Sequence, residues 1–310
     1  MPSVVRPRPE DLSRCLDWPS EVVETALGPV EYAVRGDGPP LLSIHGGPGG
    51  FDQGLLLGEP FRVNGFRVIA PSRPGYLRTP LASGPSPEEQ ADLLAALLDA
   101  LGIERAAVLG ASAGGPAAYL LAARHPGRAA ALLAVDAVSR TYTLNVSPLE
   151  QKLFVTTAGL RLMLFLTEHF PKTALTGLLQ TESTLDPEAL KRRVAEVLDD
   201  PLKRTFFVQM VHSFADRFAE RKPGVMNDLE RFAALGDLAL SSVACPALIL
   251  HGDHDNDVPP DHAAYAAGQI PGARLVLIEQ ASHLGFWLAK KADSVRETAI
   301  RWLQGAFGPL

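Results

Sequence analysis

A serine, a histidine and an aspartate occur in this sequence in settings that suit nucleophilic catalysis. Ser112 lies in the run Gly-Ala-Ser-Ala-Gly, between a stretch typical of a buried strand (Ala106 to Leu109) and one typical of a packed helix (Pro116 to Ala123). A strand that turns sharply into a helix holds its central residue in a strained backbone conformation. The neighbouring residues must then be tiny because the two backbones nearly touch, and Gly110 and Gly114 meet that demand. Ser112 is therefore the predicted nucleophile.

The base that such a serine needs is sought among the eight histidines. His283 follows the predicted strand Arg274 to Ile278, so it belongs to a loop at the carboxyl end of a strand. That is the sheet edge of Ser112 and the edge where open α/β sheets bind ligands. We predict His283 as the base that takes the hydroxyl proton. The other candidates are assigned a helix end (His125), an exposed helix face (His262), and surface or packing positions (His169 and His212).

The orienting acid is expected after the strand that lies between those of the serine and the histidine. The loop in Leu-Ile-Leu-His-Gly-Asp-His-Asp-Asn-Asp-Val-Pro carries Asp253, Asp255 and Asp257. We predict Asp255 as the carboxylate that holds His283 in one tautomer, and the other two aspartates as solvated turn residues. Asp136, which ends an earlier core strand, is the alternative acid.

The same loop also invites interpretation as a metal site, because His251, His254 and three aspartates lie close together in the sequence. A second cluster of ligands does not occur elsewhere in the sequence, and two histidines three positions apart on a loop are a weak signal. We therefore expect neither a metal ion nor a cofactor.

The glycine-rich loop His45 to Gly50 follows the predicted strand Leu41 to Ile44 at the same sheet edge. Its backbone N–H groups are free of side-chain bulk. It lacks the Lys and Ser/Thr of a phosphate-binding P-loop and the G-x-G-x-x-G order of a dinucleotide site. We predict an oxyanion site, in which the N–H of Gly47 pairs with that of Ala113, the residue after the nucleophile.

The elements that must position these groups alternate between strands and helices, which is typical of a parallel sheet covered on both faces. An antiparallel hairpin, Glu21 to Ala26 with Val30 to Val34, precedes the alternation, and residues 1 to about 20 are predicted as an irregular arm. One helix is marked strongly: Ser86 can cap it, Pro87 suits its first position and Glu89 completes a capping box.

The alternation breaks between about residues 139 and 237, where Phe, Leu, Met and Thr recur at helical spacing. We predict an α/β fold with a mostly parallel eight-stranded sheet and helices on both faces. Residues 1–138 and 238–310 form its core domain. Residues 139–237 form a helical cap, whose residues line a mainly apolar substrate site.

Composition disfavours several classes of partner and compartment. The chain has 29 basic and 35 acidic residues, a net charge of −6, without long charged runs. This argues against nucleic acid and against an anionic membrane surface as partners. The two cysteines, Cys15 and Cys245, favour a reducing compartment. The polar, proline-rich N-terminus lacks a signal-peptide core, so we expect a cytoplasmic protein, either a monomer or a homo-oligomer.

The order Ser112, Asp255, His283 resembles the serine–acid–histidine order of the α/β-hydrolase superfamily. The run His-Gly-Gly-Pro-Gly from His45 resembles the oxyanion motif shared by proline iminopeptidases and related esterases. Gly-Asp-His-Asp, ending at Asp255, resembles the acid-bearing turn, and Pro71 to Tyr76 resembles the arginine- and glycine-containing loop after the fourth strand. The resemblance extends from about residue 21 to 305.

This resemblance implies a serine hydrolase that acts on a small-molecule carboxylic ester through an acyl-enzyme on Ser112. A proline iminopeptidase-like aminopeptidase is one alternative, and a non-hydrolytic lyase or binding protein of the same fold is another. Iminopeptidases typically carry tryptophan after the nucleophile and acidic cap residues that hold the substrate's amine. Ala113 departs from that pattern, and the sequence alone places no cap acid near Ser112, so esters are favoured.

Overall fold

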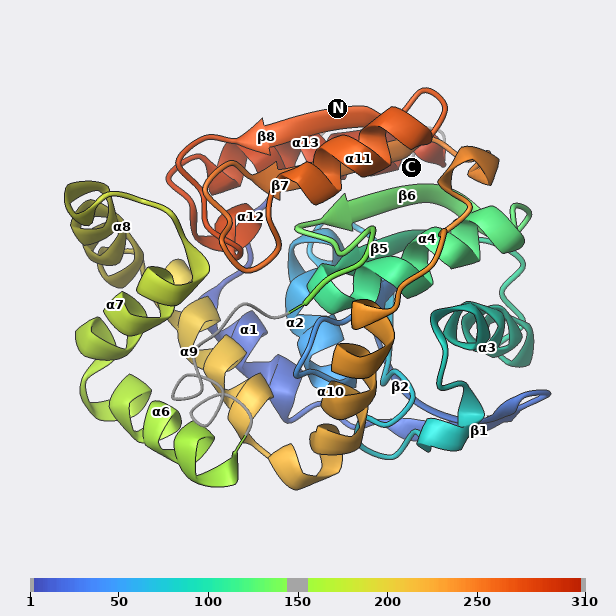
Figure 1. Ribbon diagram of the computed structural model, residues 1–310, viewed down its shortest axis with the longest axis horizontal. Helices are drawn as coiled ribbons and strands as arrows, with labels where there is room; N and C mark the ends of the chain where they lie inside the picture. Colours follow the sequence, from blue (N-terminus) through green and yellow to red (C-terminus); the bar gives the residue numbers. More distant parts are fainter. Residues whose placement is uncertain (1–2, 144–155, 308–310) are drawn as a thin grey trace.

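A mixed sheet forms the centre of the protein in the computed structural model, which describes residues 3–143 and 156–307 (Figure 1). Within these residues the sheet has eight strands in the order β1-β2-β4-β3-β5-β6-β7-β8. β1 pairs with β2 and β2 with β4 in antiparallel fashion, whereas all other pairs are parallel. The strands are β1 (Glu21–Thr25), β2 (Gly28–Arg35), β3 (Pro40–Ile44), β4 (Arg67–Pro71), β5 (Ala106–Ala111), β6 (Ala129–Val135), β7 (Ala247–Gly252) and β8 (Arg274–Ile278). The predicted fold class and edge hairpin are thus confirmed.

Helices cover both faces of the sheet, and the strands bury apolar side chains on each side. In β5, Ala107 and Leu109 join the core on one face, and Ala106 and Val108 join the core on the other. The first face is covered by α1 (Pro9–Leu16), α2 (Phe51–Arg62), α12 (Gly285–Leu288) and α13 (Ala292–Ala306). The second is covered by α3 (Pro87–Ala100), α4 (Gly115–Arg124) and α11 (Asp261–Gln269). A strand that is buried on both faces of a sheet has a continuously apolar sequence, and β5 is an example.

The N-terminal arm is not irregular throughout, because α1 occupies Pro9–Leu16. Its first turn holds Pro9, Glu10 and Asp11, which suit the positive end of a helix. Leu12 and Cys15 lie on its buried face. The prediction for α3 is confirmed: Ser86 and Glu89 form the expected reciprocal cap.

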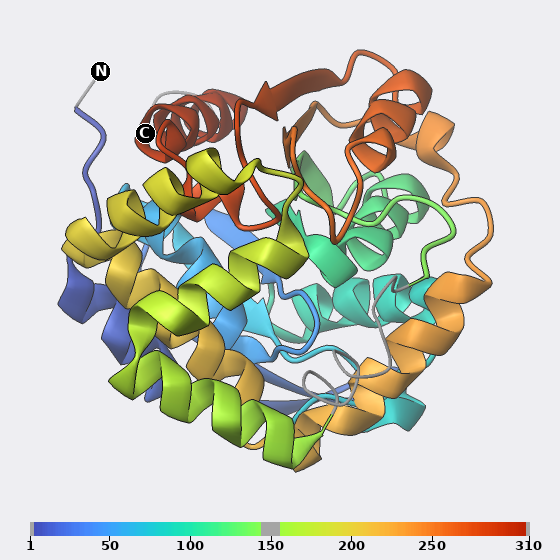
Figure 2. The same ribbon diagram turned by 60° about the vertical axis from the view of Figure 1, so that its left-hand side comes forward.

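In the described part of the chain between β6 and β7, five α-helices lie beyond the carboxyl ends of the strands (Figures 1 and 2). They are α6 (Thr157–His169), α7 (Pro171–Glu182), α8 (Pro187–Asp199), α9 (Pro201–Ala215) and α10 (Phe218–Ala233). α9 packs against α1, α2 and α12 of the remaining chain. Residues 144–155 of the predicted cap lie outside the described residues.

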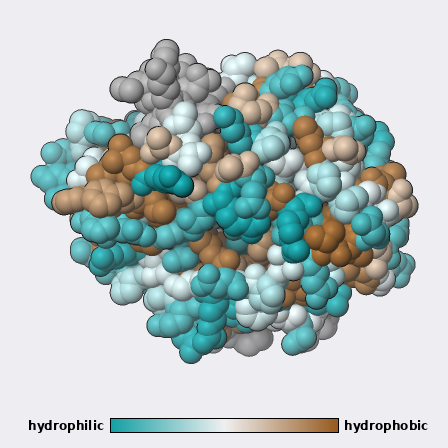
Figure 3. Space-filling view, turned by 90° about the horizontal axis from the view of Figure 1, so that it is seen from below, coloured by the Kyte–Doolittle hydropathy of each residue, from teal (hydrophilic) through white to brown (hydrophobic). Residues whose placement is uncertain are grey.

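The surface carries separate apolar patches among hydrophilic side chains, as one face shows (Figure 3). Leu162 and Phe165 on α6 are about half exposed, at 51% and 48%. Among the described residues, no helix combines the length and the apolar character needed to cross a membrane.

Candidate active site

Ser112 lies at a tight turn between β5 and α4. Its φ of +50° is in the left-handed region, which costs free energy in any residue with a side chain. A Cβ on Gly110 would lie 2.4 Å from that of Ala118 in α4, so strand and helix do nearly touch. A Cβ on Gly114 would lie 2.6 Å from the carbonyl oxygen of His45. This second glycine therefore makes room for the neighbouring glycine-rich loop.

The structure brings the three predicted residues together in one hydrogen-bonded chain. Ser112 Oγ lies 2.9 Å from His283 Nε2, and His283 Nδ1 lies 2.8 Å from Asp255 Oδ2. The other carboxylate oxygen of Asp255 accepts the backbone N–H groups of Asp257 and Val258, each at 2.9 Å. Asp255 is thereby fixed by backbone donors while it orients the imidazole.

Charge around His283 favours its protonated form. Burial by itself lowers the pKa of His283, but the negative charges of Asp255 and Asp257 outweigh burial and raise it well above the ordinary value. For Asp255, burial raises the pKa, and the neighbouring His283 and His251 outweigh it and lower the pKa. The pair is suited to stabilise an imidazolium.

Asp257 is not the solvated turn residue that the sequence predicts. It is half-buried, its Oδ1 accepts the hydroxyl of Tyr142 at 2.8 Å, and its Oδ2 lies 3.4 Å from His283 Nε2. Asp257 follows Asp255 by two residues in the same turn, and its side chain also faces the site, where Tyr142 donates a hydrogen bond to it. His283 therefore faces one carboxylate on each of its ring nitrogens.

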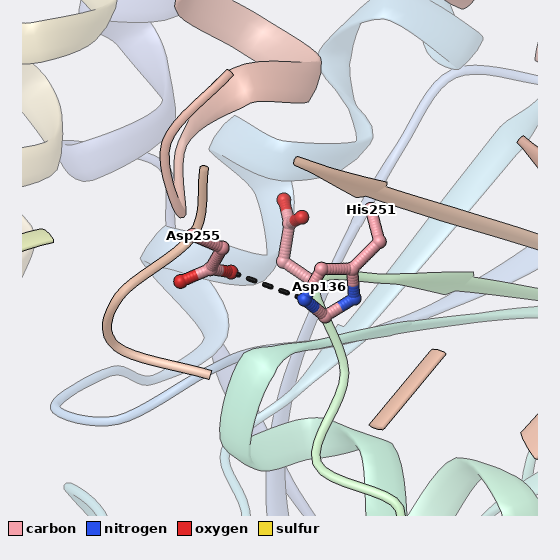
Figure 4. A group of neighbouring side chains, drawn as sticks. All are labelled: Asp136, His251 and Asp255. Atoms are coloured by element: carbon pink, nitrogen blue, oxygen red, sulfur yellow. Dashed lines mark ion pairs between the residues drawn. The ribbon is translucent and has the colours of Figure 1, made fainter. Parts of the chain in front are cut away.

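The alternative acid, Asp136, lies close to both Asp255 and His251 (Figure 4). Its Oδ1 accepts the backbone N–H of Gly252 at 2.8 Å, whereas its buried Oδ2 has no hydrogen-bond partner. Burial raises the pKa of Asp136 to about 7. His283 hydrogen-bonds Asp255, so the geometry favours Asp255 as the orienting acid.

Asp136, His251 and Asp255 also place potential metal-ligand atoms within 4.8 Å of one another. His251 Nε2 contacts the carbonyl oxygen of Val258 at 2.7 Å and Asp255 Oδ2 at 3.3 Å, whereas His251 Nδ1 and Asp136 Oδ2 have no hydrogen-bond partner among the described residues. A cation held there would compete with His283 for the carboxylate of Asp255. His251 supports the loop that carries Asp255, because it contacts both Val258 and Asp255 of that loop.

Gly47 and Ala113, the predicted oxyanion residues, both line the pocket at Ser112. A Cβ on Gly47 would lie 3.4 Å from that of Ala113, so the two segments are immediate neighbours. Gln53 of α2 supports the loop, because its Oε1 accepts the N–H of Gly46 at 2.8 Å. Arg73 supports it from the other side by donating to the carbonyl oxygens of His45 and Gly46, each at 3.1 Å.

The other histidines considered as the base, His125, His169, His212 and His262, do not contact Ser112, His283 or Asp255 within the described residues, and one prediction among them is wrong. His125 ends α4 as expected, and His169 is exposed. His262 is buried rather than exposed. Its Nδ1 accepts the N–H of Ser139 at 3.1 Å. The segment after β6 covers α11 at this point, which the sequence does not reveal.

A pocket of about 190 Å³ opens over Ser112 and His283. Its walls are mostly apolar and come from both parts of the chain: Leu57, Val138, Leu284 and Trp287 from outside the predicted cap, and Leu160, Leu178, Met210, Phe214, Val225, Leu229 and Phe232 from within it. Two acids of the predicted cap, Glu182 and Asp228, line it as well. The sequence alone did not place either near Ser112.

Glu182 is the last residue of α7 and has an unusual environment. Its buried Oε2 has no hydrogen-bond partner. Burial raises the pKa of Glu182 to about 8, and the nearby Asp257 and Asp255 add to the rise. Its backbone carbonyl oxygen accepts the N–H of Asn256 at 3.1 Å, which ties the end of α7 to the acid loop.

Residues 39–290 match the family described as alpha/beta hydrolase fold. The chain belongs to this family. Among solved α/β hydrolases, an alpha/beta hydrolase fold protein from Nakamurella multipartita is 40% identical, with a TM-score of 0.89 and coverage of 94% of this chain and 100% of that one. The uncharacterized hydrolase YcgS of Bacillus subtilis (strain 168) is 29% identical over 89% of this chain and 95% of its own length. A 2-hydroxy-6-oxo-6-phenylhexa-2,4-dienoate hydrolase of Comamonas testosteroni is 26% identical over 89% and 91% of the two chains.

Proposed function

We propose that this α/β hydrolase is a serine hydrolase that cleaves carboxylic esters of small molecules through an acyl-enzyme on Ser112. The observation that carries the proposal is the continuous hydrogen-bonded chain from Ser112 through His283 to Asp255. It lies at a mainly apolar pocket, which suits an ester better than a charged polymer. Residues 139–237 then act as a cap domain over the substrate.

The geometry supports the following steps. Ser112 Oγ attacks the ester carbonyl carbon while its proton moves to His283 Nε2, and Asp255 stabilises the resulting imidazolium. The N–H groups of Gly47 and Ala113 stabilise the negative oxygen of the tetrahedral intermediate. The carbon–oxygen bond to the alcohol then breaks, and His283 gives its proton to the leaving oxygen. A water molecule repeats the attack on the acyl-enzyme, releases the carboxylic acid and restores Ser112.

A second candidate function is an aminopeptidase of the proline iminopeptidase kind. One observation favours it: the pocket contains Glu182, a cap carboxyl group that could hold the ammonium of an aminoacyl substrate. Ala113, in place of the tryptophan typical of iminopeptidases, still favours the ester proposal.

Labelling with a fluorophosphonate probe tests the proposal directly. The probe should label the wild type and a control variant, Ser43→Ala, whose serine is buried in β3 away from the pocket. It should not label Ser112→Ala, and that variant should lose ester hydrolysis by several orders of magnitude because triad members act as a unit. If the probe labelled Ser112→Ala, or if this variant kept a tenth of the wild-type activity, Ser112 would be ruled out as the nucleophile.

A further inference from the structure

Apart from His283, the charged side chains among the described residues that line the pocket are all acidic. Among its described lining residues are the acids Asp136, Glu182, Asp228 and Asp257, and no lysine or arginine. Two of these acids are compensated elsewhere. Asp228 forms an ion pair with Arg73, and Asp136 accepts a backbone N–H and lies beside His251.

Within residues 3–143 and 156–307, Glu182 and Asp257 have no cationic partner other than His283. The carboxylate of Asp257 receives a hydroxyl from Tyr142 and lies 3.4 Å from His283 Nε2. Glu182 Oε2 is buried and has no hydrogen-bond partner among the residues that the structure describes, which is costly unless a ligand supplies one. Glu182 also ends the twelve-residue helix α7, whose carboxyl end adds partial negative charge.

Both acids line the same pocket as Ser112 and His283. His283 Nε2, which faces Asp257, lies 2.9 Å from Ser112 Oγ. The carbonyl oxygen of Glu182 accepts the N–H of Asn256, so the end of α7 is bound to the loop that carries Asp255. Because Glu182 and Asp257 line the pocket that holds Ser112, a substrate that fills this pocket meets both side chains.

We propose that Glu182 and Asp257 form a charge-selective subsite that favours esters bearing an ammonium group and rejects esters bearing a carboxylate. This inference rests on the proposed function. When Glu182 is ionised, an ammonium group would offset the negative charges of both side chains and supply the partner that Glu182 Oε2 lacks. A carboxylate in the same place would be repelled by both side chains in a site of low dielectric.

The selectivity can be measured with methyl esters that differ in charge but little in shape, followed by pH-stat titration at pH 9. The cationic ester methyl 4-(trimethylammonio)butyrate is compared with its neutral isostere, methyl 5,5-dimethylhexanoate. The anionic ester methyl hydrogen glutarate is compared with its neutral isostere, methyl 5-methylhexanoate. Butyrylcholine against 3,3-dimethylbutyl butyrate tests a charge on the alcohol side. Since burial raises the pKa of Glu182 to about 8, pH 9 ensures that it is ionised.

In at least one of the two cationic pairs, we expect kcat/KM for the cationic ester to be at least tenfold higher than for its neutral isostere. For the anionic ester, we expect kcat/KM to be at least tenfold lower than for its neutral isostere. In the double variant Glu182→Gln, Asp257→Asn both ratios should move at least tenfold toward unity. Glu188→Gln, which removes an exposed acid on α8, should leave them unchanged. Ratios that stay the same in the double variant, or a preference for the anionic ester, would overturn the subsite.

A failure of the proposed function has a different signature. If no ester is hydrolysed, the subsite is tested without turnover by calorimetric binding of choline and of 3,3-dimethylbutanol. Choline should bind the wild type more tightly, and this preference should disappear in the double variant. Equal binding of the two alcohols by the wild type would overturn the subsite independently of any reaction.

Discussion

Arg73 and Asp228 form a buried bidentate ion pair that joins the loop after β4 to α10. Arg73 Nη1 lies 2.9 Å from Asp228 Oδ1 and Nη2 lies 2.7 Å from Oδ2, and the Tyr76 hydroxyl donates to the same Oδ2 at 2.6 Å. Two parallel charge-assisted hydrogen bonds fix orientation as well as distance. Because Arg73 also donates to the carbonyl oxygens of His45 and Gly46, α10 is coupled to the proposed oxyanion loop.

Asp228→Ala should destabilise the protein and slow its chemistry. The change leaves Arg73 buried with only 1% of its side chain exposed and without its anionic partner. Breaking one side of a buried pair costs about 3–5 kcal/mol, so the free energy of unfolding in urea should fall by that amount. kcat should fall more than KM rises, because the oxyanion loop loses support that matters in the transition state.

The apolar double variant Arg73→Met, Asp228→Leu provides the control. Replacing both partners removes the unpaired charge, so much of the lost stability should return. The lower kcat should persist, because the hydrogen bonds to His45 and Gly46 are still absent. A single variant Asp228→Ala as stable as the wild type would contradict the role of this pair.

Local signals in the sequence were sufficient to predict several elements, including those next to Ser112 and His283. The elbow at Ser112, the strand before His283 and the reciprocal cap of α3 each depend on residues a few positions apart. α2 was not predicted because Gly54, Gly58 and Pro60 interrupt its helical pattern. A Cβ on Gly58 would lie 2.6 Å from Cγ1 of Val68, so the glycine is required by close packing on the sheet.

The acids of the pocket could not be located from the sequence because tertiary contacts position them. Tyr142, 115 positions away in the chain, binds Asp257 and holds it against His283. Glu182 reaches the site because α7 ends where the acid loop passes, as the hydrogen bond from Asn256 shows. Neither contact has a periodicity or a motif that a sequence could display.

Asp255→Asn should lower kcat by roughly 10⁴-fold, because the amide favours the wrong tautomer of His283. Asp136→Asn should cost far less, since Asp136 Oδ1 accepts a backbone N–H from Gly252 and the amide oxygen can do the same. Steady-state kinetics of the two variants with one ester decides the assignment. If Asp136→Asn is the more damaging change, the orienting acid is the residue after β6.

Asp257→Asn should shift the acid limb of the pH–rate profile to lower pH. Activity requires neutral His283, and the negative charges of Asp255 and Asp257 hold its pKa above the ordinary value against the effect of burial. Removing one negative charge lowers that pKa, so the active form persists in more acidic solution. The asparagine can still accept the hydroxyl of Tyr142, which limits structural change.

The pH dependence of kcat/KM for a neutral ester measures this shift. Asp253→Asn is the matched control, because Asp253 accepts the N–H of Ala281 and contacts His254 rather than His283. Its limb should coincide with that of the wild type. A limb that does not move in Asp257→Asn would show that Asp257 has no electrostatic effect on the base.

The apolar wall of the pocket predicts how uncharged esters are ranked. Each methylene that enters contributes about 0.8 kcal/mol, so kcat/KM for p-nitrophenyl esters should rise about fourfold per carbon from short to medium acyl chains. Beyond the length that the pocket accommodates, the rise should stop. Leu229→Phe narrows the pocket from α10 at a partly exposed position and should move the optimum to a shorter chain.

Proline p-nitroanilide, measured under the same conditions, should be a poor substrate, because binding an ammonium at Glu182 does not by itself improve the amide leaving group. A kcat/KM for the anilide equal to that of the best ester would favour the aminopeptidase instead.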